Sequence, residues 1–159
     1  VGIMKVYHTS PVIVENPDIA HSRDFLDFGS GFYVTTMLNQ AQKYGDRFIR
    51  RGKDAILNIY ELADDLTAWK VIEFKHYDEA WLDFVTECRA GRTVGDYDVV
   101  IGGIANDKVF RTVDLYYAGE INKEECLRRL IFEEPNNQIC IRTQRVLDEC
   151  LTYKSSQRL

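Results

Sequence analysis

Four residues of the sequence suit the binding of a flat, polar ligand. They are His8 at the end of the first expected strand, Tyr33 just past the turn Phe28-Gly29-Ser30-Gly31, Tyr44 on the next helix, and Gln138 at the head of a late apolar strand. The two glycines permit a positive φ and let a ligand approach the backbone, because neither carries a Cβ. Taken singly, each residue also has a structural interpretation, and a lone Gly-x-Gly favours it.

The elements that position these residues are short strands with helices interspersed unevenly among them. From hydrophobic periodicity and β-branched or aromatic runs, we expect strands at 3–8, 32–36, 54–62, 69–74, 97–104 and 138–142, and helices at 38–51, 78–89, 108–117, 123–130 and 143–150. The sequence shows no internal repeat and no second domain. We therefore expect a single α+β domain over residues 1–159, with a mixed or antiparallel sheet.

Cap residues mark several of the expected helix ends. Asp78 and Asn122 suit N-caps, Gly52 suits the position after a helix, and Asn106 or Asp107 suits the start of the helix at 108–117. The segment 12–26 has little regular pattern. At this length a loop is often functional, so it could line a pocket.

Composition indicates a globular protein and argues against several classes. The chain has 159 residues, 45% of them hydrophobic, and a net charge of −5. Its acidic balance disfavours non-specific nucleic-acid binding, and we interpret the basic residues at 47–53 as a solvated helix end. No apolar run approaches the ~20 residues of a membrane span, and no signal-peptide pattern opens the chain. We expect a cytoplasmic protein without membrane contact.

The cysteines and histidines carry no metal signature. The four cysteines are Cys88, Cys126, Cys140 and Cys150, with no Cys-x-x-Cys spacing and no histidine at zinc-ligand spacing. Reduced and mostly buried thiols are the simplest interpretation.

Read together, the separate motifs resemble the ADP-ribosyltransferase superfamily, in the branch that includes the poly(ADP-ribose) polymerases and diphtheria toxin. The matching stretches are Tyr7-His8-Thr9-Ser10, Phe28-Gly29-Ser30-Gly31-Phe32-Tyr33-Val34, Ala41-Gln42-Lys43-Tyr44 and Asn137-Gln138-Ile139-Cys140-Ile141. The resemblance covers residues 5–142. It implies an ADP-ribosyltransferase-like split mixed/antiparallel β-sheet with flanking helices, and NAD as the substrate.

The resemblance also implies roles for individual residues. His8 would bond the adenosine-side ribose, the backbone of Thr9 would meet the nicotinamide amide, and Tyr33 and Tyr44 would sandwich the nicotinamide ring. Gln138 would face the nicotinamide ribose. His8, Tyr33 and Gln138 would thus form the catalytic set.

Three further residues belong to the implied NAD site. Ser10 and Gly31 lie within the matching motifs, and Arg23 in the long loop could meet the pyrophosphate through its guanidinium fork. The chain also resembles an uncharacterised bacterial family whose members are often taken to be toxins paired with a small antitoxin. The acceptor of the ADP-ribose could be a protein, a nucleic acid or a small molecule.

Gln138 departs from the family pattern, which has a glutamate there. An amide oxygen accepts a hydrogen bond from a ribose hydroxyl, but it cannot act as a general base and carries no charge. The substitution favours transfer of a single ADP-ribose over chain elongation. Two alternatives remain. The protein could be a non-catalytic module that binds NAD or ADP-ribose, or an interaction protein on the same fold. Glu133 and Glu134 could supply a carboxylate, although an exposed acidic turn is the preferred interpretation.

Overall fold

Two β-sheets meet along one edge in the computed structural model, which describes residues 2–21, 27–92, 94–103 and 107–159. The strands are β1 (Ile3–Ser10), β2 (Phe32–Val34), β3 (Ile56–Ala63), β4 (Val71–Glu73), β5 (Val99–Gly102), β6 (Gln138–Ile141) and β7 (Leu151–Arg158). One sheet has the order β1-β3-β7 and the other the order β2-β6-β5-β4. They are joined by a bridge between Tyr7 and Thr35.

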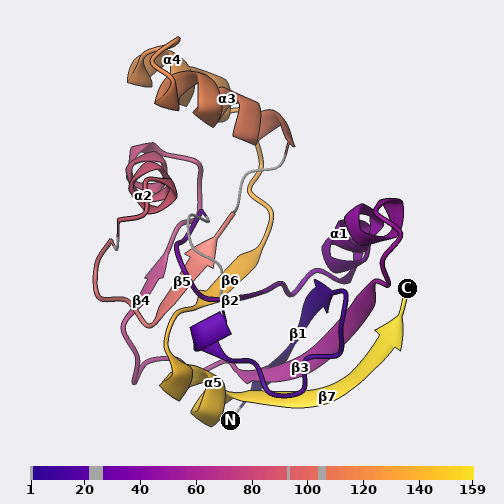
Figure 1. The fold of residues 1–159 in the computed structure, drawn as a ribbon. Helices are drawn as coiled ribbons and strands as arrows, with labels where there is room; N and C mark the ends of the chain where they lie inside the picture. The colour runs from indigo at the N-terminus through magenta and orange to yellow at the C-terminus, as the bar shows by residue number, and fades with distance from the viewer. Residues whose placement is uncertain (1, 22–26, 93, 104–106) are drawn as a thin grey trace.

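Helices flank both sheets (Figure 1). They are η1 (Ile19–His21, a 3-10 turn), α1 (Leu38–Arg50), α2 (Glu79–Arg89), α3 (Asp107–Tyr117), α4 (Lys123–Leu130) and α5 (Gln144–Cys150). α1 lies beside the first sheet, whereas α2, α3 and α4 lie on the side of the second sheet. Within the described residues, no helix combines the length and the apolar character needed to cross a membrane.

Strand direction distinguishes the two sheets. All pairs of the first sheet are antiparallel. The second is mixed, because β4 pairs with β5 in parallel while β6 is antiparallel to both of its neighbours. The α+β class with a mixed and an antiparallel sheet is therefore confirmed.

Each face of the second sheet has its own hydrophobic core. On one face, side chains of the sheet pack against the three helices around Trp81, Phe28 and Val113. On the other, Phe32, Ile139 and neighbouring side chains pack against the first sheet around Tyr60 and Val6, with α5 alongside. Alternate residues of β2 and β6 thus face different cores, as the two-residue period of a strand requires.

Local cap signals from the sequence are confirmed. The side chain of Asp78 accepts a hydrogen bond from Trp81 N–H at the start of α2. Gly52 has φ +72° after α1. The N–H groups of Gly52 and Lys53 bond back to the carbonyls of Ile49 and Phe48, which is the Schellman pattern expected of a glycine stop.

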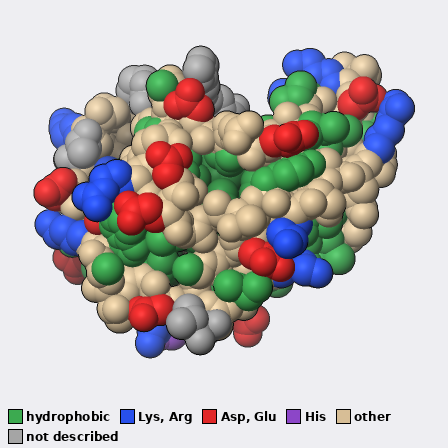
Figure 2. Space-filling view, turned by 90° about the horizontal axis from the view of Figure 1, so that it is seen from below, with side chains coloured by type: hydrophobic (Ala, Val, Ile, Leu, Met, Phe, Trp, Pro, Cys, Tyr) green, Lys and Arg blue, Asp and Glu red, His purple; other side chains and the backbone are tan. Residues whose placement is uncertain are grey.

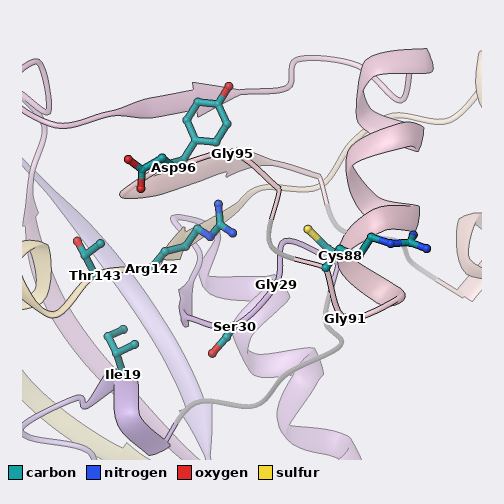
Figure 3. Close-up of a pocket in the computed structure, with 11 residues that line it drawn as sticks. Ile19, Gly29, Ser30, Cys88, Gly91, Gly95, Asp96, Arg142 and Thr143 are labelled. Atoms are coloured by element: carbon teal, nitrogen blue, oxygen red, sulfur yellow. The ribbon is translucent and has the colours of Figure 1, made fainter.

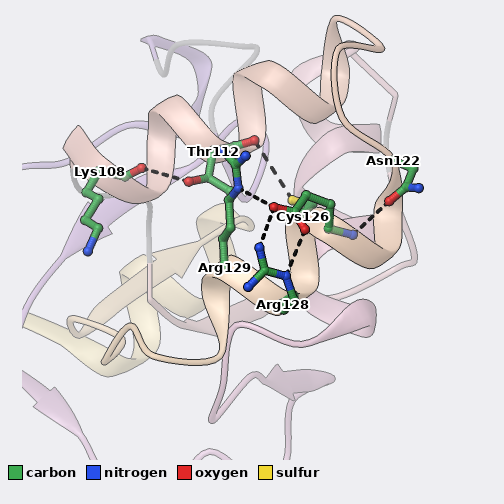
Figure 4. Close-up of polar contacts among 7 residues, drawn as sticks. Lys108, Thr112, Asn122, Cys126, Arg128 and Arg129 are labelled. Carbon is green, nitrogen blue, oxygen red and sulfur yellow. Dashed lines mark hydrogen bonds and ion pairs between the residues drawn. The ribbon is translucent and has the colours of Figure 1, made fainter.

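The start of α4 is fixed by the other predicted cap (Figure 4). Asn122 Oδ1 accepts from Glu125 N–H at 2.8 Å. Glu125 in turn accepts hydrogen bonds from Arg128 and Arg129, which lower the pKa of its carboxyl to about 2. Cys126 Sγ lies against the Thr112 carbonyl, so α4 contacts α3 along this face.

Other expectations differ from the structure. The sequence does not predict β7, since residues 151–158 are mostly polar, yet this strand pairs with β3 along its length and contains a bulge. β1 continues to Ser10, two residues beyond the expected end, because its pairing with β3 persists to Ile56. Asn106 lies outside the described residues, and Asp107 is already the first helical residue of α3.

Asn58 of β3 is a fully buried polar residue that ties three segments together. Its Oδ1 accepts from Val14 N–H and from Ser156 Oγ, and its Nδ2 donates to the carbonyls of His8 and Val12. The loop after β1 is thereby held against the first sheet.

We expect Asn58→Leu to lower the free energy of unfolding by about 2–4 kcal/mol, because it leaves several buried polar groups without partners. Urea denaturation checks this value. Gln42→Leu, on the exposed face of α1, serves as the control and should change stability by less than about 0.5 kcal/mol. Equal effects of the two variants would contradict the assignment of Asn58 as a structural hub.

Candidate functional site

Among the described residues, a single backbone bridge joins the two sheets. Tyr7 N–H donates to the Thr35 carbonyl at 2.8 Å, and Thr35 N–H donates to the Tyr7 carbonyl at 3.0 Å. Successive residues of a strand direct their backbone groups to opposite edges, so Thr9, two residues on, directs its N–H and C=O to the same edge as Tyr7. In the described part of the chain, neither group has a backbone partner there. A backbone donor and a backbone acceptor of Thr9 are thus unpaired on this edge among the described residues, although the residue as a whole is buried.

His8 lies at this junction and contacts β2. Its Nδ1 is 2.7 Å from the Tyr33 carbonyl oxygen. A carbonyl only accepts, so Nδ1 carries the proton, and in the neutral imidazole Nε2 is the acceptor nitrogen. The ring also packs against Phe32, with centroids 4.3 Å apart. The structure therefore brings two of the predicted residues, His8 and Tyr33, into direct contact through the Tyr33 backbone.

The side chain of Tyr33 is fixed to the glycine turn. Its hydroxyl donates to the Gly29 carbonyl at 2.6 Å and accepts from Phe28 N–H at 3.0 Å. The ring lies nearly parallel to that of Phe28. Burial, more than any charged neighbour, raises the pKa of this hydroxyl far above its ordinary value, so it stays protonated at any physiological pH.

Gly29 and Gly31 of the turn are glycines for different structural reasons. Gly29 has φ +81°, a conformation that favours glycine. At Gly31, an added Cβ would lie 2.5 Å from Cys140 Sγ and 2.8 Å from the Ile141 carbonyl oxygen. Packing of the turn on β6 alone requires a glycine at position 31, and a role in ligand approach remains a prediction.

Gln138 opens β6 on the same face as Tyr33. Tyr33 pairs with Cys140, and residues two apart on a strand share a face. Continuing this register places Gln138 opposite Thr35, which bridges to Tyr7, so about 10 Å separates the backbones of Gln138 and Tyr7 across two strand spacings. The Gln138 side chain is half-buried and has no hydrogen-bond partner among the described residues.

The chain just before Gln138 is fastened to its surroundings. Asn137 Oδ1 accepts from both the N–H and the hydroxyl of Thr36, at 3.2 and 3.0 Å. Asn137 N–H donates to Gln40 Oε1 in the first turn of α1. These contacts hold the head of β6 against β2 and α1, although sequence reasoning had not singled out Asn137.

α1 packs closely on β1 beside the junction. Thr9 Oγ1 donates to the Ala41 carbonyl at 2.7 Å. A Cβ at Gly45 would lie 2.9 Å from the end of the Leu159 side chain and 3.2 Å from Ala55 Cβ, so the glycine allows this close approach without a shift of its neighbours. Tyr44 immediately precedes Gly45, whose added Cβ would lie 3.4 Å from the Thr9 side chain.

Tyr44 does not meet Tyr33 in the structure. The Arg47 guanidinium lies 4.2 Å from the Tyr44 ring centre and covers one face of the ring, and Phe48 meets this ring edge-on. Among the described residues there is no ring contact between the two tyrosines. The predicted sandwich of a flat ligand stays a prediction.

The structure describes only one of the other two predicted residues, Ser10 and Arg23. Ser10 Oγ donates to the Val12 carbonyl at 2.6 Å, which makes it part of the loop held by Asn58. Arg23 lies outside the described residues. Within the described part of the chain, no group of three His, Cys, Asp or Glu side chains could hold a metal ion.

The junction is flanked by two pockets. One, of about 300 Å³, is lined in part by Gly29 and Ser30 of the turn. The other, of about 500 Å³, includes Thr36 and Asn137 next to Gln138. His8, Tyr33 and Gln138 line neither pocket. Seen from below, the surface is also hollowed between its broad part and the narrower part on the side of α1 and the C-terminus, with hydrophobic side chains along the hollow (Figure 2).

These features define an α+β protein of two sheets, with an open backbone edge and half-buried polar groups at their junction. The chain belongs to the family described as "Protein of unknown function (DUF3990)", whose model matches residues 4–153. No curated protein and no solved structure matches the chain.

Proposed function

We propose that the protein is a mono-ADP-ribosyltransferase that cleaves NAD between nicotinamide and its ribose and transfers ADP-ribose to an acceptor. The observation that carries the proposal is the junction of the sheets, where His8, the open edge of Thr9 and the Gln138 amide lie on strands joined by one bridge. The division into an antiparallel and a mixed sheet supports an ADP-ribosyltransferase-like fold as part of the same proposal.

The open backbone edge of Thr9 suits a carboxamide. A carboxamide carries one acceptor oxygen and an NH₂ donor, and Thr9 offers a backbone donor and acceptor on one edge. Nicotinamide bears this group. The bond from Thr9 Oγ1 to α1 fixes the strand where the two hydrogen bonds would form.

Gln138 suits the ribose that nicotinamide leaves. When that bond breaks, its electron pair departs with nicotinamide and positive charge develops on the ribose, as in glycoside cleavage. The Gln138 amide oxygen can accept a hydrogen bond from a ribose hydroxyl and so hold the ring in place. It supplies no charge and no base, so the acceptor must be a sufficient nucleophile by itself.

Aromatic rings complete the proposed site. Stacking orients a leaving ring, and is worth about 0.5–1.5 kcal/mol beyond the buried area. The Tyr33 ring is held in place by its bonds to the glycine turn. Tyr44 offers a second ring from α1, with Arg47 over one of its faces.

A non-catalytic NAD or ADP-ribose binding module is the second candidate. The missing carboxylate at Gln138 favours it, since recognition by His8 and Thr9 does not require a charge at that position. Both candidates predict NAD binding and differ only in turnover. The acceptor, a toxin role and an antitoxin partner stay predictions.

Isothermal titration with NAD tests the proposed site. We expect saturable binding that His8→Ala weakens at least about tenfold, because the variant removes both the contact with β2 and a ligand-facing imidazole. His76→Ala is the matched control, since His76 is exposed after β4, and should bind like the wild type. Absence of NAD binding by the folded wild type would contradict both candidates.

A further inference from the structure

The smaller of the two pockets lies beside the glycine turn (Figure 3) and has neither His8 nor Gln138 in its walls. It has a volume of about 300 Å³ and lies between the turn that precedes β2, the end of α2 and the residues that follow β6. Its walls include Gly29, Ser30, Gly95, Arg142 and Thr143. This volume is at the lower end of the range for small-molecule pockets, so it suits a small ligand.

Arg142 brings an unpaired positive charge into this pocket. Its Nη1 donates to the Val94 carbonyl at 3.1 Å, and its backbone N–H donates to the Asp98 carbonyl. The guanidinium forms no ion pair in the described part of the chain. In Figure 3 it points into the middle of the pocket, while the carboxylate of Asp96 turns away from it.

The other charged lining groups are Arg92 and Asp96. Arg92 is also positive, but it is engaged with Glu87 at 3.1 Å. Burial raises the pKa of the Cys88 thiol to about 11 although Arg142 lowers it, so the thiol is neutral near pH 7. Arg142 is therefore the positive lining group without an ion pair among the described residues, and Asp96 is the negative lining group.

Further hydroxyl groups and part of the backbone line the same pocket as Arg142. Thr143 Oγ1 is buried and has no hydrogen-bond partner among the described residues, and a buried polar group of this kind usually has one. Gly29 has a positive φ and carries no side chain, so a ligand can approach the backbone there, where an added Cβ would lie 3.6 Å from Arg142 Nη2. The corresponding space beside Gly95 is filled by the Tyr97 ring. Ser30 adds a hydroxyl from the turn.

We propose that this pocket binds the oxyanion of a small ligand, a phosphate or a carboxylate group, with Arg142 as its main partner. A guanidinium matches such an oxyanion with two parallel hydrogen bonds, and Thr143 and Ser30 can donate further ones. The site is separate from the proposed NAD site, and its existence does not depend on NAD turnover. The two sites share only the glycine turn, which Tyr33 holds from the other side.

Titration of the ¹⁵N-labelled chain with inorganic phosphate, and separately with acetate, tests this site by NMR. We expect at least one of the two anions to change the amide chemical shifts of Gly29, Gly95 and Thr143 in a saturable way, with a Kd of roughly 1–10 mM. Saturation by phosphate alone supports a phosphorylated ligand, and saturation by acetate alone supports a carboxylate. Shifts that stay linear with either salt would overturn the proposal.

Variants separate a built site from a general charge effect. Arg142→Gln should weaken binding at least about tenfold, whereas Arg92→Gln, which removes the same charge from an outer position, should change it less than about twofold. Thr143→Val keeps the side-chain shape and should weaken binding about threefold or more. It provides the test if Arg142→Gln does not fold. Equal effects of Arg142→Gln and Arg92→Gln, or no effect of Thr143→Val, would overturn the assignment.

Discussion

Tyr33→Ala is expected to lower nicotinamide release from NAD at least about 100-fold. The variant removes the ring proposed to orient the leaving group, and it frees the glycine turn from the hydroxyl that bonds Gly29 and Phe28. Misplacement of a reacting group by about 1 Å can cost this much. Chromatographic measurement of nicotinamide, with each variant at equal concentration, gives the rates.

Two further variants distinguish chemistry from folding. Tyr33→Phe keeps the ring and loses only the bonds to the turn, so we expect an intermediate rate and a smaller loss of stability. Tyr117→Ala removes an exposed tyrosine at the end of α3 and should leave the rate unchanged. The proposed role of Tyr33 is wrong if the Tyr33→Ala variant folds and releases nicotinamide at the wild-type rate.

Gln138→Glu is expected to raise the rate of nicotinamide release about tenfold or more. A carboxylate at the head of β6 would face the positive charge that develops on the ribose, and preorganised charges of this kind contribute strongly to catalysis. The effect requires the ionised form. The gain should therefore disappear as the pH falls through the ordinary carboxyl range near 4.3.

The matched control for this variant is Gln157→Glu. Gln157 is exposed on β7, which lies on the other side of β3 from β1, so the same change in net charge is made on a strand that takes no part in the junction, and we expect no change in rate. Gln138→Leu, which removes the hydrogen-bond acceptor, should lower any wild-type rate. A gain in Gln157→Glu equal to that in Gln138→Glu would show that only net charge matters and would contradict the placement of Gln138.

Local features of the fold were predictable because their signals are local. Asp78 and Asn122 cap the helices that follow them, and Gly52 ends α1, as their residue types predict. β7 was missed for the opposite reason. Its residues are mostly polar, and the strand forms because β3 provides a long partner almost a hundred residues earlier in the chain.

The candidate site was predictable only in part. Resemblance pointed to His8 and Tyr33, and the structure joins them by one hydrogen bond. The use of the Tyr33 hydroxyl to hold its own turn could not be predicted, since it depends on how β2 packs. Asn58 and Arg142 stand in apolar-looking strand patterns, so their polar roles emerge only when segments distant in sequence come together.

Nicotinamide release by the wild-type chain tests the central proposal most directly. NAD labelled in the nicotinamide ring is incubated with the purified protein, alone and with a cell lysate that supplies acceptors. We predict time-dependent release of nicotinamide that His8→Ala and Tyr33→Ala abolish. If the wild type binds NAD but releases no nicotinamide under either condition, the protein is a binding module and the enzymatic proposal is wrong.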